Sequence, residues 1–142
     1  AGLAPLDSAA APYGTGLYAP EWNHRTYREL ADRATKLLRL GETVILDASW
    51  TSKQQRDLLA LVAEHEHAHL TSLRCEAPQS LTAERIRTRT QGASDADTTI
   101  ATAMHAHAAP WPESTPINTS GTLTNAVEQA LNTLQPHGPE HK

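Results

Sequence analysis

The chain has 142 residues with a formal net charge of -4, which argues against a general binding surface for nucleic acids or anionic membranes. Hydrophobic residues make up 39% of it but aromatic residues only 4%, so one domain with a core of Leu, Ala, Ile and Val is expected. No apolar run could span a bilayer, and the single cysteine, Cys75, cannot form an internal disulfide. We therefore expect a cytoplasmic protein.

The chain begins at Ala1 without a Met, so we expect it to be processed or to be part of something longer. Residues 1–20 are rich in Ala, Pro and Gly and show no periodicity, which predicts a loop. Gly14 and Gly16 form a weak match to a phosphate-binding loop, because no third glycine or following Lys completes the motif.

Helical spacing of apolar residues begins after Pro20 and predicts an amphipathic helix that ends at Gly41. The apolar positions are Tyr27, Leu30, Ala31, Ala34, Leu37 and Leu38.

The stretch GETVILDASW at 41–50 organises the rest of the chain. Its apolar run Val44-Ile45-Leu46 is typical of a short strand buried on both faces of a parallel sheet. Asp47 follows directly, at the carboxyl end of the expected strand, where open α/β sheets bind their ligands. The sequence pattern leaves a second interpretation open, in which Asp47 caps the next turn or helix.

The remaining pattern alternates between helices and strands, which is typical of a parallel α/β sheet. We expect a helix from Ser52 with a capping box, a strand over 69–75, helices over 80–90 and from Ser94, an edge strand over 116–119, and a helix over 123–134. On the second strand Cys75 is expected to be a small core residue. The tail from Pro136 to Lys142 is expected to be disordered.

Arg85 and Arg89 stand four residues apart, so they share one face of the expected helix. Two guanidinium groups on one face suit a polyphosphate, because Arg pairs bidentately with phosphate oxygens. A solvated helix face without a ligand explains the same pattern.

Histidines at 65, 67 and 69 alternate, and on a strand they would point the same way as a set of metal ligands. A helix that ends near His65 would break this alternation, and we expect no metal site.

Several segments, taken in order, resemble one family. They are Tyr18-Ala19-Pro20-Glu21-Trp22, Arg25-Thr26-Tyr27, residues 41–50, Arg74-Cys75-Glu76-Ala77-Pro78, Arg85 and Arg89 with Ser94-Asp95-Ala96, Pro110-Trp111-Pro112 and Asn118-Thr119-Ser120. The chain resembles, over nearly its whole length, the P-loop kinase (AAA-type ATP-binding) domain that is joined to an aminoglycoside-phosphotransferase-like domain in actinobacterial proteins. Gluconate kinase and the zeta-toxin group are similar at greater distance.

The resemblance implies an α/β fold of the P-loop NTPase type and ATP-dependent phosphoryl transfer to a small-molecule substrate, with Mg-ATP as the cofactor. Asp47 would correspond to a carboxylate oriented toward magnesium or the reacting group. Arg85 and Arg89 match arginines of a lid, at about 80–108, that closes over the γ-phosphate. Arg56 falls at a recurrent arginine that helps to bind substrate or nucleotide.

One departure from the family is large: the 142 residues contain no G-x-x-x-x-G-K-[ST] motif. Residues 1–135 are therefore expected to be a partial domain that lacks the first strand and the P-loop and does not bind ATP by itself. Two interpretations remain open. The chain is the C-terminal part of a kinase domain whose P-loop lies upstream in the parent protein, or it is a binding or scaffolding module that pairs through exposed sheet edges.

Overall fold

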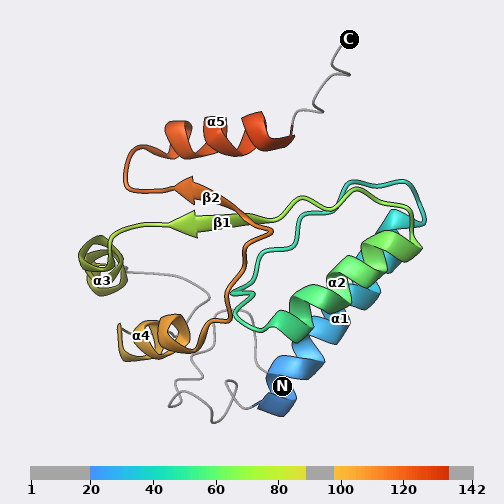
Figure 1. Ribbon diagram of the computed structural model, residues 1–142, viewed down its shortest axis with the longest axis horizontal. Coiled ribbons are helices and arrows are strands. Elements are labelled where there is room, and N and C mark those ends of the chain that lie inside the picture. Colours follow the sequence, from blue (N-terminus) through green and yellow to red (C-terminus); the bar gives the residue numbers. More distant parts are fainter. Residues whose placement is uncertain (1–19, 89–97, 135–142) are drawn as a thin grey trace. The chain divides into compact units, whose positions relative to one another are not determined.

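The computed structural model describes residues 20–88 and 98–134 of the chain (Figure 1). These residues form, in order, α1 (Pro20–Leu38), α2 (Lys53–His65), β1 (Leu73–Glu76), α3 (Gln79–Thr88), α4 (Thr98–His107), β2 (Thr115–Asn118) and α5 (Leu123–Leu134). The chain divides into a first unit, Ala1–Leu70 with Ile86–Pro110, and a second unit, Thr71–Arg85 with Trp111–Lys142. The helices and the parallel strand pair confirm the expected α/β class.

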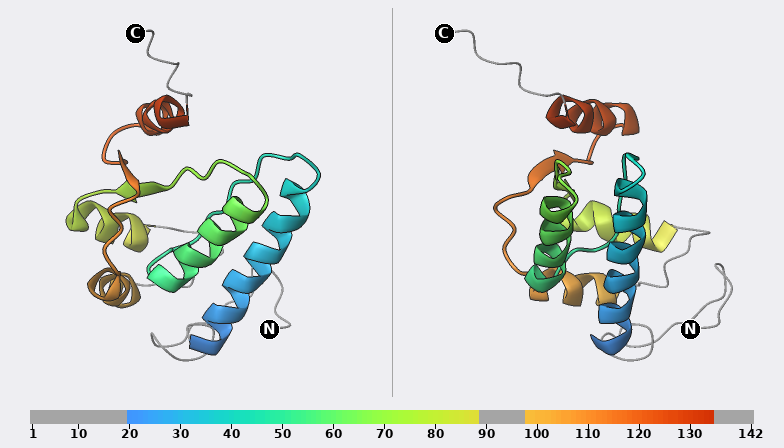
Figure 2. Two further views of the ribbon diagram at one scale, coloured as in Figure 1. Left: turned by 45° about the vertical axis from the view of Figure 1, so that its right-hand side comes forward. Right: turned by 90° about the vertical axis from the view of Figure 1, so that its right-hand side faces the viewer.

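The first unit is built on the pair of helices α1 and α2, which lie side by side in both views of Figure 2. Its core joins Ala31 and Ala34 of α1 to Leu59 of α2, and all three are buried. Partly buried apolar side chains extend this core: Val44, Leu46, Trp50, Leu58 and Val62. The core of this unit is therefore made of small and aliphatic side chains, as the scarcity of aromatic residues predicts.

Gly41 ends the first helix, as the sequence predicts. Its φ angle of 79° lies in the left-handed region, which glycine adopts without steric cost. The Gly41 N–H donates to the Leu38 carbonyl at 2.9 Å, and the Glu42 N–H donates to the Leu37 carbonyl at 3.1 Å. Two carbonyls of the last helical turn are satisfied in this way.

The prediction of a strand at 44–46 is wrong. Residues 42–47 are not paired with any strand in the described structure. Val44 and Leu46 pack against the core of the two helices, whereas Ile45 is 91% exposed. Side chains alternate between the two faces of this segment, and only the face with Val44 and Leu46 packs against the helices. No described strand pairs with this segment, so the burial expected on both faces is absent.

Other boundaries follow the sequence closely. Ser52 is the N-cap of α2, but the expected capping box is absent: the Ser52 side chain makes no capping hydrogen bond, and Gln55 Oε1, which would complete the box, accepts none. Helix α3 agrees with the expected helix over 80–90, and α5 agrees with the one over 123–134. The capping box at Ser94 and the tail from Pro136 fall outside the residues that the structure describes.

The second unit contains the sheet of the described residues, in which β1 and β2 run parallel. The register pairs Leu73 with Thr115 and Glu76 with Asn118. Ile117 is buried, and α5 packs against β2. The strand at 69–75 was expected to be longer and to bury Cys75, but β1 begins at Leu73 and Cys75 is exposed. Three of the four residues of β1, Cys75 among them, are exposed, so this strand is not the buried core strand that was expected.

Candidate functional site

Asp47 lies in the segment that connects α1 to α2, and its side chain is exposed. The carboxylate makes no hydrogen bond or ion pair with any residue that the structure describes, and the N-cap of α2 is Ser52. The described contacts therefore give no support to the interpretation of Asp47 as a cap. A carboxylate without a partner remains available to an external ligand.

The residues just after Asp47 are fixed by side chains from α1. The hydroxyl of Tyr27 lies 2.9 Å from Ser49 Oγ and accepts a 3.1 Å hydrogen bond from the Trp50 N–H. The rings of Tyr27 and Trp50 meet edge to face with centroids 4.8 Å apart. Trp50 has a φ of 49°, a left-handed conformation that is costly for a bulky residue and persists only where its surroundings hold it. The turn after Asp47 is thus positioned by its neighbours.

Arg56 of α2 supports the same turn from the other side. Its Nη1 donates to the Trp50 carbonyl at 2.8 Å and to the Ala109 carbonyl at 3.4 Å, and its Nη2 donates to the Pro110 carbonyl at 2.7 Å. The Ala109 N–H in turn donates to the Thr51 carbonyl at 2.9 Å. Arg56 therefore ties the segment after α4 to the start of α2. Its role in binding substrate or nucleotide stays a prediction.

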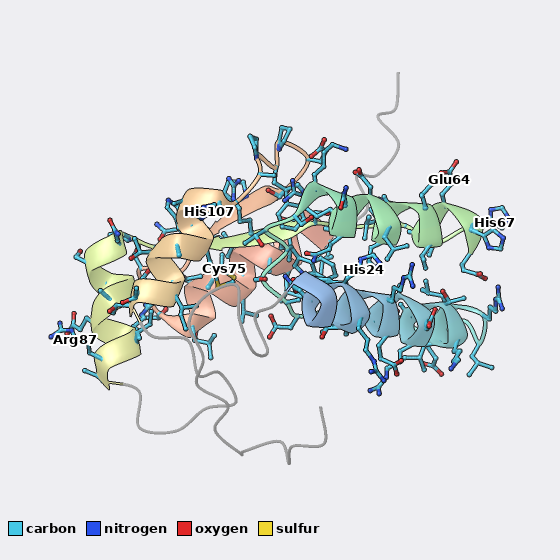
Figure 3. The ribbon with its side chains drawn as sticks, turned by 90° about the horizontal axis from the view of Figure 1, so that it is seen from below. His24, Glu64, His67, Cys75, Arg87 and His107 are labelled. Atoms are coloured by element: carbon cyan, nitrogen blue, oxygen red, sulfur yellow. The ribbon has the colours of Figure 1, made fainter. Side chains whose placement is uncertain are left out.

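Arg85 lies on α3, in the second unit, and its Nη2 donates to the Thr119 carbonyl at 2.7 Å. Arg87, labelled in Figure 3, is exposed on the same helix. Arg89 falls outside the residues that the structure describes. Asp47 and Arg56 belong to the first unit, so the roles of the three predicted catalytic residues, Asp47, Arg85 and Arg89, stay predictions.

An open depression of about 870 Å³, which the sequence pattern did not predict, lies along α1 and the beginning of α2. It is lined by Asn23, His24, Tyr27, Arg28, Ser52, Gln54, Gln55, Asp57, Leu58 and Leu61. The polar residues that each helix contributes to this lining have the spacing of an ordinary solvent-exposed helix face. Only the packing of α1 against α2 brings the two polar sets together.

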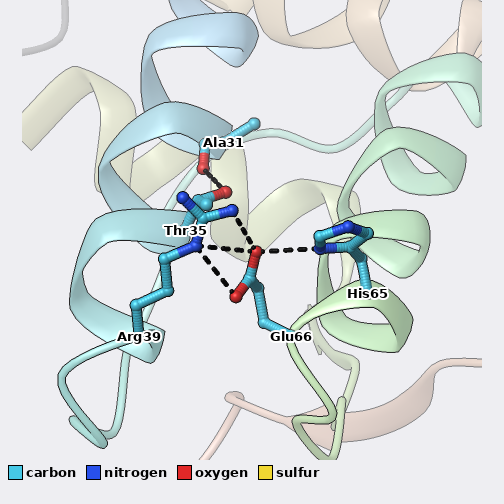
Figure 4. A network of polar contacts seen from close by, with 5 residues as sticks. All are labelled: Ala31, Thr35, Arg39, His65 and Glu66. Atoms are coloured by element: carbon cyan, nitrogen blue, oxygen red, sulfur yellow. Dashed lines mark hydrogen bonds and ion pairs between the residues drawn. The ribbon is translucent and has the colours of Figure 1, made fainter.

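Arg39, Glu66 and His65 form a polar network at the end of the two helices (Figure 4). Arg39 Nη2 and Nε donate to Glu66 Oε1 at 2.9 Å and 3.1 Å, and the His65 ring nitrogen lies 3.0 Å from the same oxygen. The hydrogen bond from Arg39, and after it the one from His65, lowers the pKa of Glu66 below its ordinary range. The network links the C-terminal ends of α1 and α2.

The histidines do not form a set of metal ligands in the described structure. His65 is the last residue of α2, and His67 lies in the turn beyond it with a φ of 53° (Figure 3). The alternation therefore does not lie on a strand. Within residues 20–88 and 98–134, no three His, Cys, Asp or Glu side chains are placed to hold a metal ion. In the same ranges, no helix is both long enough and apolar enough to cross a membrane.

The parallel strand pair and the helices make this an α/β protein, in agreement with a P-loop kinase-like fold. The model of the AAA domain family matches residues 6–111, and the chain belongs to this family. It is 35% identical over 116 residues to the uncharacterized protein Rv2004c of Mycobacterium tuberculosis strain H37Rv and to the uncharacterized protein Mb2027c of Mycobacterium bovis. The alignment covers 82% of this chain but 23% of each relative, so the chain spans about a quarter of their length. No solved structure matches the chain.

Proposed function

We propose that the chain is the C-terminal part of an ATP-dependent small-molecule phosphotransferase domain of the kinase type. The observation that carries the proposal is the AAA domain match over residues 6–111. The relatives are about four times as long as the matched region, which leaves room in a parent protein for the P-loop that this sequence lacks. The proposed reaction moves the γ-phosphoryl group of ATP to an oxygen of the acceptor and releases ADP.

In this proposal each predicted residue has a distinct task. Asp47 orients magnesium or the reacting group, and its lack of any partner among the described residues supports this role. Arg85 and Arg89 neutralise the charge on the γ-phosphoryl group in the transition state. Arg56 contributes to nucleotide or substrate binding through the turn that it holds.

The upstream P-loop segment is the proposed partner of the chain, and the strand edges indicate where it would add. The N–H groups of Thr115 and Thr119 donate to carbonyls of the first strand, so Pro116 and Asn118 direct their backbone groups outward. Pro116 has no N–H, and the backbone of Asn118 is bonded on both sides by the Gln129 side chain. The outer edge of β2 is therefore closed to a further strand.

The outer edge of β1 is open by the same geometry. The carbonyls of Ser72 and Glu76 accept bonds from β2, so Leu73 and Cys75 direct their backbone groups to the opposite edge. Among the described residues these groups have no partner. The open edge supports the addition of an upstream strand, and it equally favours the alternative function of a module without a P-loop that binds partners through this edge.

The isolated chain is expected not to bind Mg-ATP, because P-loop affinity comes chiefly from a glycine-rich backbone, its Lys and the bound magnesium. Exposed charge pairs contribute only about 0–1 kcal/mol each, whereas micromolar binding requires about 8 kcal/mol. Titration calorimetry of residues 1–142, alone and extended upstream, tests the proposal. We expect saturable Mg-ATP binding only in the extended protein. Micromolar binding by residues 1–142 alone, or none by the extended protein, would contradict it.

A further inference from the structure

Trp50 is held at both ends of its backbone by side chains from two helices. Its N–H donates to the Tyr27 hydroxyl of α1 at 3.1 Å, and its carbonyl accepts from Arg56 Nη1 of α2 at 2.8 Å. Trp50 has a left-handed φ of 49°, which a bulky residue keeps only where its surroundings enforce it. The two hydrogen bonds provide this constraint, and the edge-to-face contact with the Tyr27 ring adds to it.

The same guanidinium reaches the backbone that follows α4. Arg56 donates to the carbonyls of Ala109 at 3.4 Å and Pro110 at 2.7 Å, and the Ala109 N–H donates to the Thr51 carbonyl at 2.9 Å. Residues 108–110 lie outside any helix or strand, so their carbonyls need donors from elsewhere. Pro110 is also the last residue of the first unit before the chain passes into the second. One side chain therefore anchors both this exit and the turn that contains the strained residue.

These bonds favour an indirect role for Arg56. Both terminal nitrogens of the guanidinium are engaged by backbone carbonyls, and the two shortest bonds, at 2.7 Å and 2.8 Å, have the length of charge-assisted hydrogen bonds. A phosphate group that took these donors would break the contacts with the Trp50 and Pro110 carbonyls. The side chain is therefore placed to hold the backbone near the proposed catalytic carboxylate of Asp47, and not to bind the nucleotide itself.

We propose that Arg56 is a positioning residue, which couples the turn after Asp47 to the chain exit at Pro110, so that a displacement of one segment is transmitted to the other. The inference rests on the proposed function, because it gives Arg56 an effect on turnover through this turn. Packed side chains and hydrogen bonds carry coupling of this kind. Here the connected set is Tyr27, Trp50 and Arg56.

Hydrogen exchange of backbone amides in residues 1–142 tests the coupling, with the Ala34 amide of the core as the reference for global opening. We expect Arg56→Lys to accelerate exchange at Trp50 and Ala109 at least tenfold relative to this reference, because an ammonium group keeps the charge but lacks the fork of donors. Tyr27→Phe breaks the bond at the Trp50 N–H only. The coupling predicts that it also accelerates exchange at Ala109, which Tyr27 does not bond.

Arg39→Lys is the matched control, since it disturbs the two-pronged contact with Glu66 at the C-terminal ends of α1 and α2 and bonds neither segment. Both relative exchange rates should stay at their wild-type values in this variant. A wild-type rate at Ala109 in Tyr27→Phe overturns the coupling. Acceleration by Arg39→Lys equal to that by Arg56→Lys overturns it as well.

The effect on turnover is measured in the protein extended upstream. Arg56→Lys is expected to lower kcat at least tenfold and to change the KM for ATP less than about twofold, since the guanidinium acts on the turn and not on the nucleotide. A raised KM with unchanged kcat would place Arg56 in nucleotide binding and overturn the inference. Absence of ATP turnover in the unsubstituted extended protein would contradict the proposed function instead, and the exchange rates would still decide the coupling.

Discussion

The hydroxyl oxygen of Tyr27 lies 2.9 Å from the hydroxyl oxygen of Ser49, so a residue of α1 holds the turn that follows Asp47. The same hydroxyl accepts a hydrogen bond from the Trp50 N–H. Tyr27 is almost fully buried, at 3% exposed, and its ring packs against Trp50. The first helix therefore fixes Ser49 and Trp50, the residues that shortly follow Asp47.

Tyr27→Phe removes both hydrogen bonds but keeps the ring. We expect the free energy of unfolding to fall by about 1–3 kcal/mol, because each net hydrogen bond contributes about 0.5–1.5 kcal/mol. Urea denaturation measures the change. Ser49→Ala removes one of the two bonds and should cost about half as much. Equal stability of Tyr27→Phe and wild type would show that the hydroxyl does not hold the turn.

Asp47→Asn should abolish ATP turnover in the protein that includes the upstream segment and leave the melting temperature unchanged. The exposed carboxylate makes no hydrogen bond or ion pair with the described residues, so we expect the fold not to depend on its charge. A coupled assay of ADP release and a thermal melt give the two readings. Glu42→Gln, an exposed carboxylate before the same apolar run, is the matched control and should retain activity. Wild-type turnover of Asp47→Asn, or collapse of its fold, would refute the assignment.

Arg85→Ala and Arg89→Ala should each lower turnover by about 10²-fold or more, with a smaller effect on nucleotide affinity, because their contacts strengthen as charge develops in the transition state. Steady-state kinetics and nucleotide titration separate the two effects. Arg87→Ala, on the same exposed helix, should be neutral. Since Arg85 also donates to the Thr119 carbonyl, a thermal melt is needed to detect a structural loss. If the Arg85 and Arg89 variants match Arg87→Ala in turnover, the solvated-face interpretation is correct.

Glu66→Gln should destabilise the protein at neutral pH but not in acid. The hydrogen bond from Arg39, followed by that from His65, lowers the pKa of Glu66 in the folded state below the ordinary value of 4.5. The stabilisation by its charge is therefore present above that value and is lost as the pH falls through the lower folded pKa. Urea unfolding of both proteins between pH 7 and pH 2 measures the difference.

The control for this pH series is Glu64→Gln, an exposed residue of the same helix that makes no ion pair with a described residue (Figure 3). Its stability should follow that of wild type throughout the titration. A difference between Glu66→Gln and wild type that persisted at the lowest pH would show that the network stabilises through packing rather than charge.

Arg56→Ala should lower the free energy of unfolding, because the guanidinium donates to three backbone carbonyls. Hydrogen bonds from charged groups contribute about 1.5–3 kcal/mol each, and the longest bond contributes least. Arg56→Lys keeps the charge but not the fork of donors, so it should recover only part of the loss. Urea denaturation checks this. A variant with wild-type stability and weakened nucleotide binding would favour the binding role instead.

The sequence by itself determined where the described helices lie and how the first of them ends. The apolar spacing from Tyr27 to Leu38 requires one buried face, and Gly41 is suited to the left-handed conformation that ends the helix. The edge strand expected over 116–119 was equally readable and is observed as β2, Thr115–Asn118, since proline is tolerated where no partner strand needs its N–H. These features depend on local geometry, which neighbours in sequence fix.

The tertiary structure decided which of these elements have partners. An apolar run such as Val44 to Leu46 becomes a strand only when another backbone pairs with it, and the described residues supply none, so Ile45 and likewise Cys75 are exposed. The depression depends in the same way on the packing of α1 against α2, which places Arg28 and Gln55 in the lining of one depression. Strand pairing and burial depend on contacts between segments that are distant in sequence. The periodicity of one segment does not tell which other segment will pack against it.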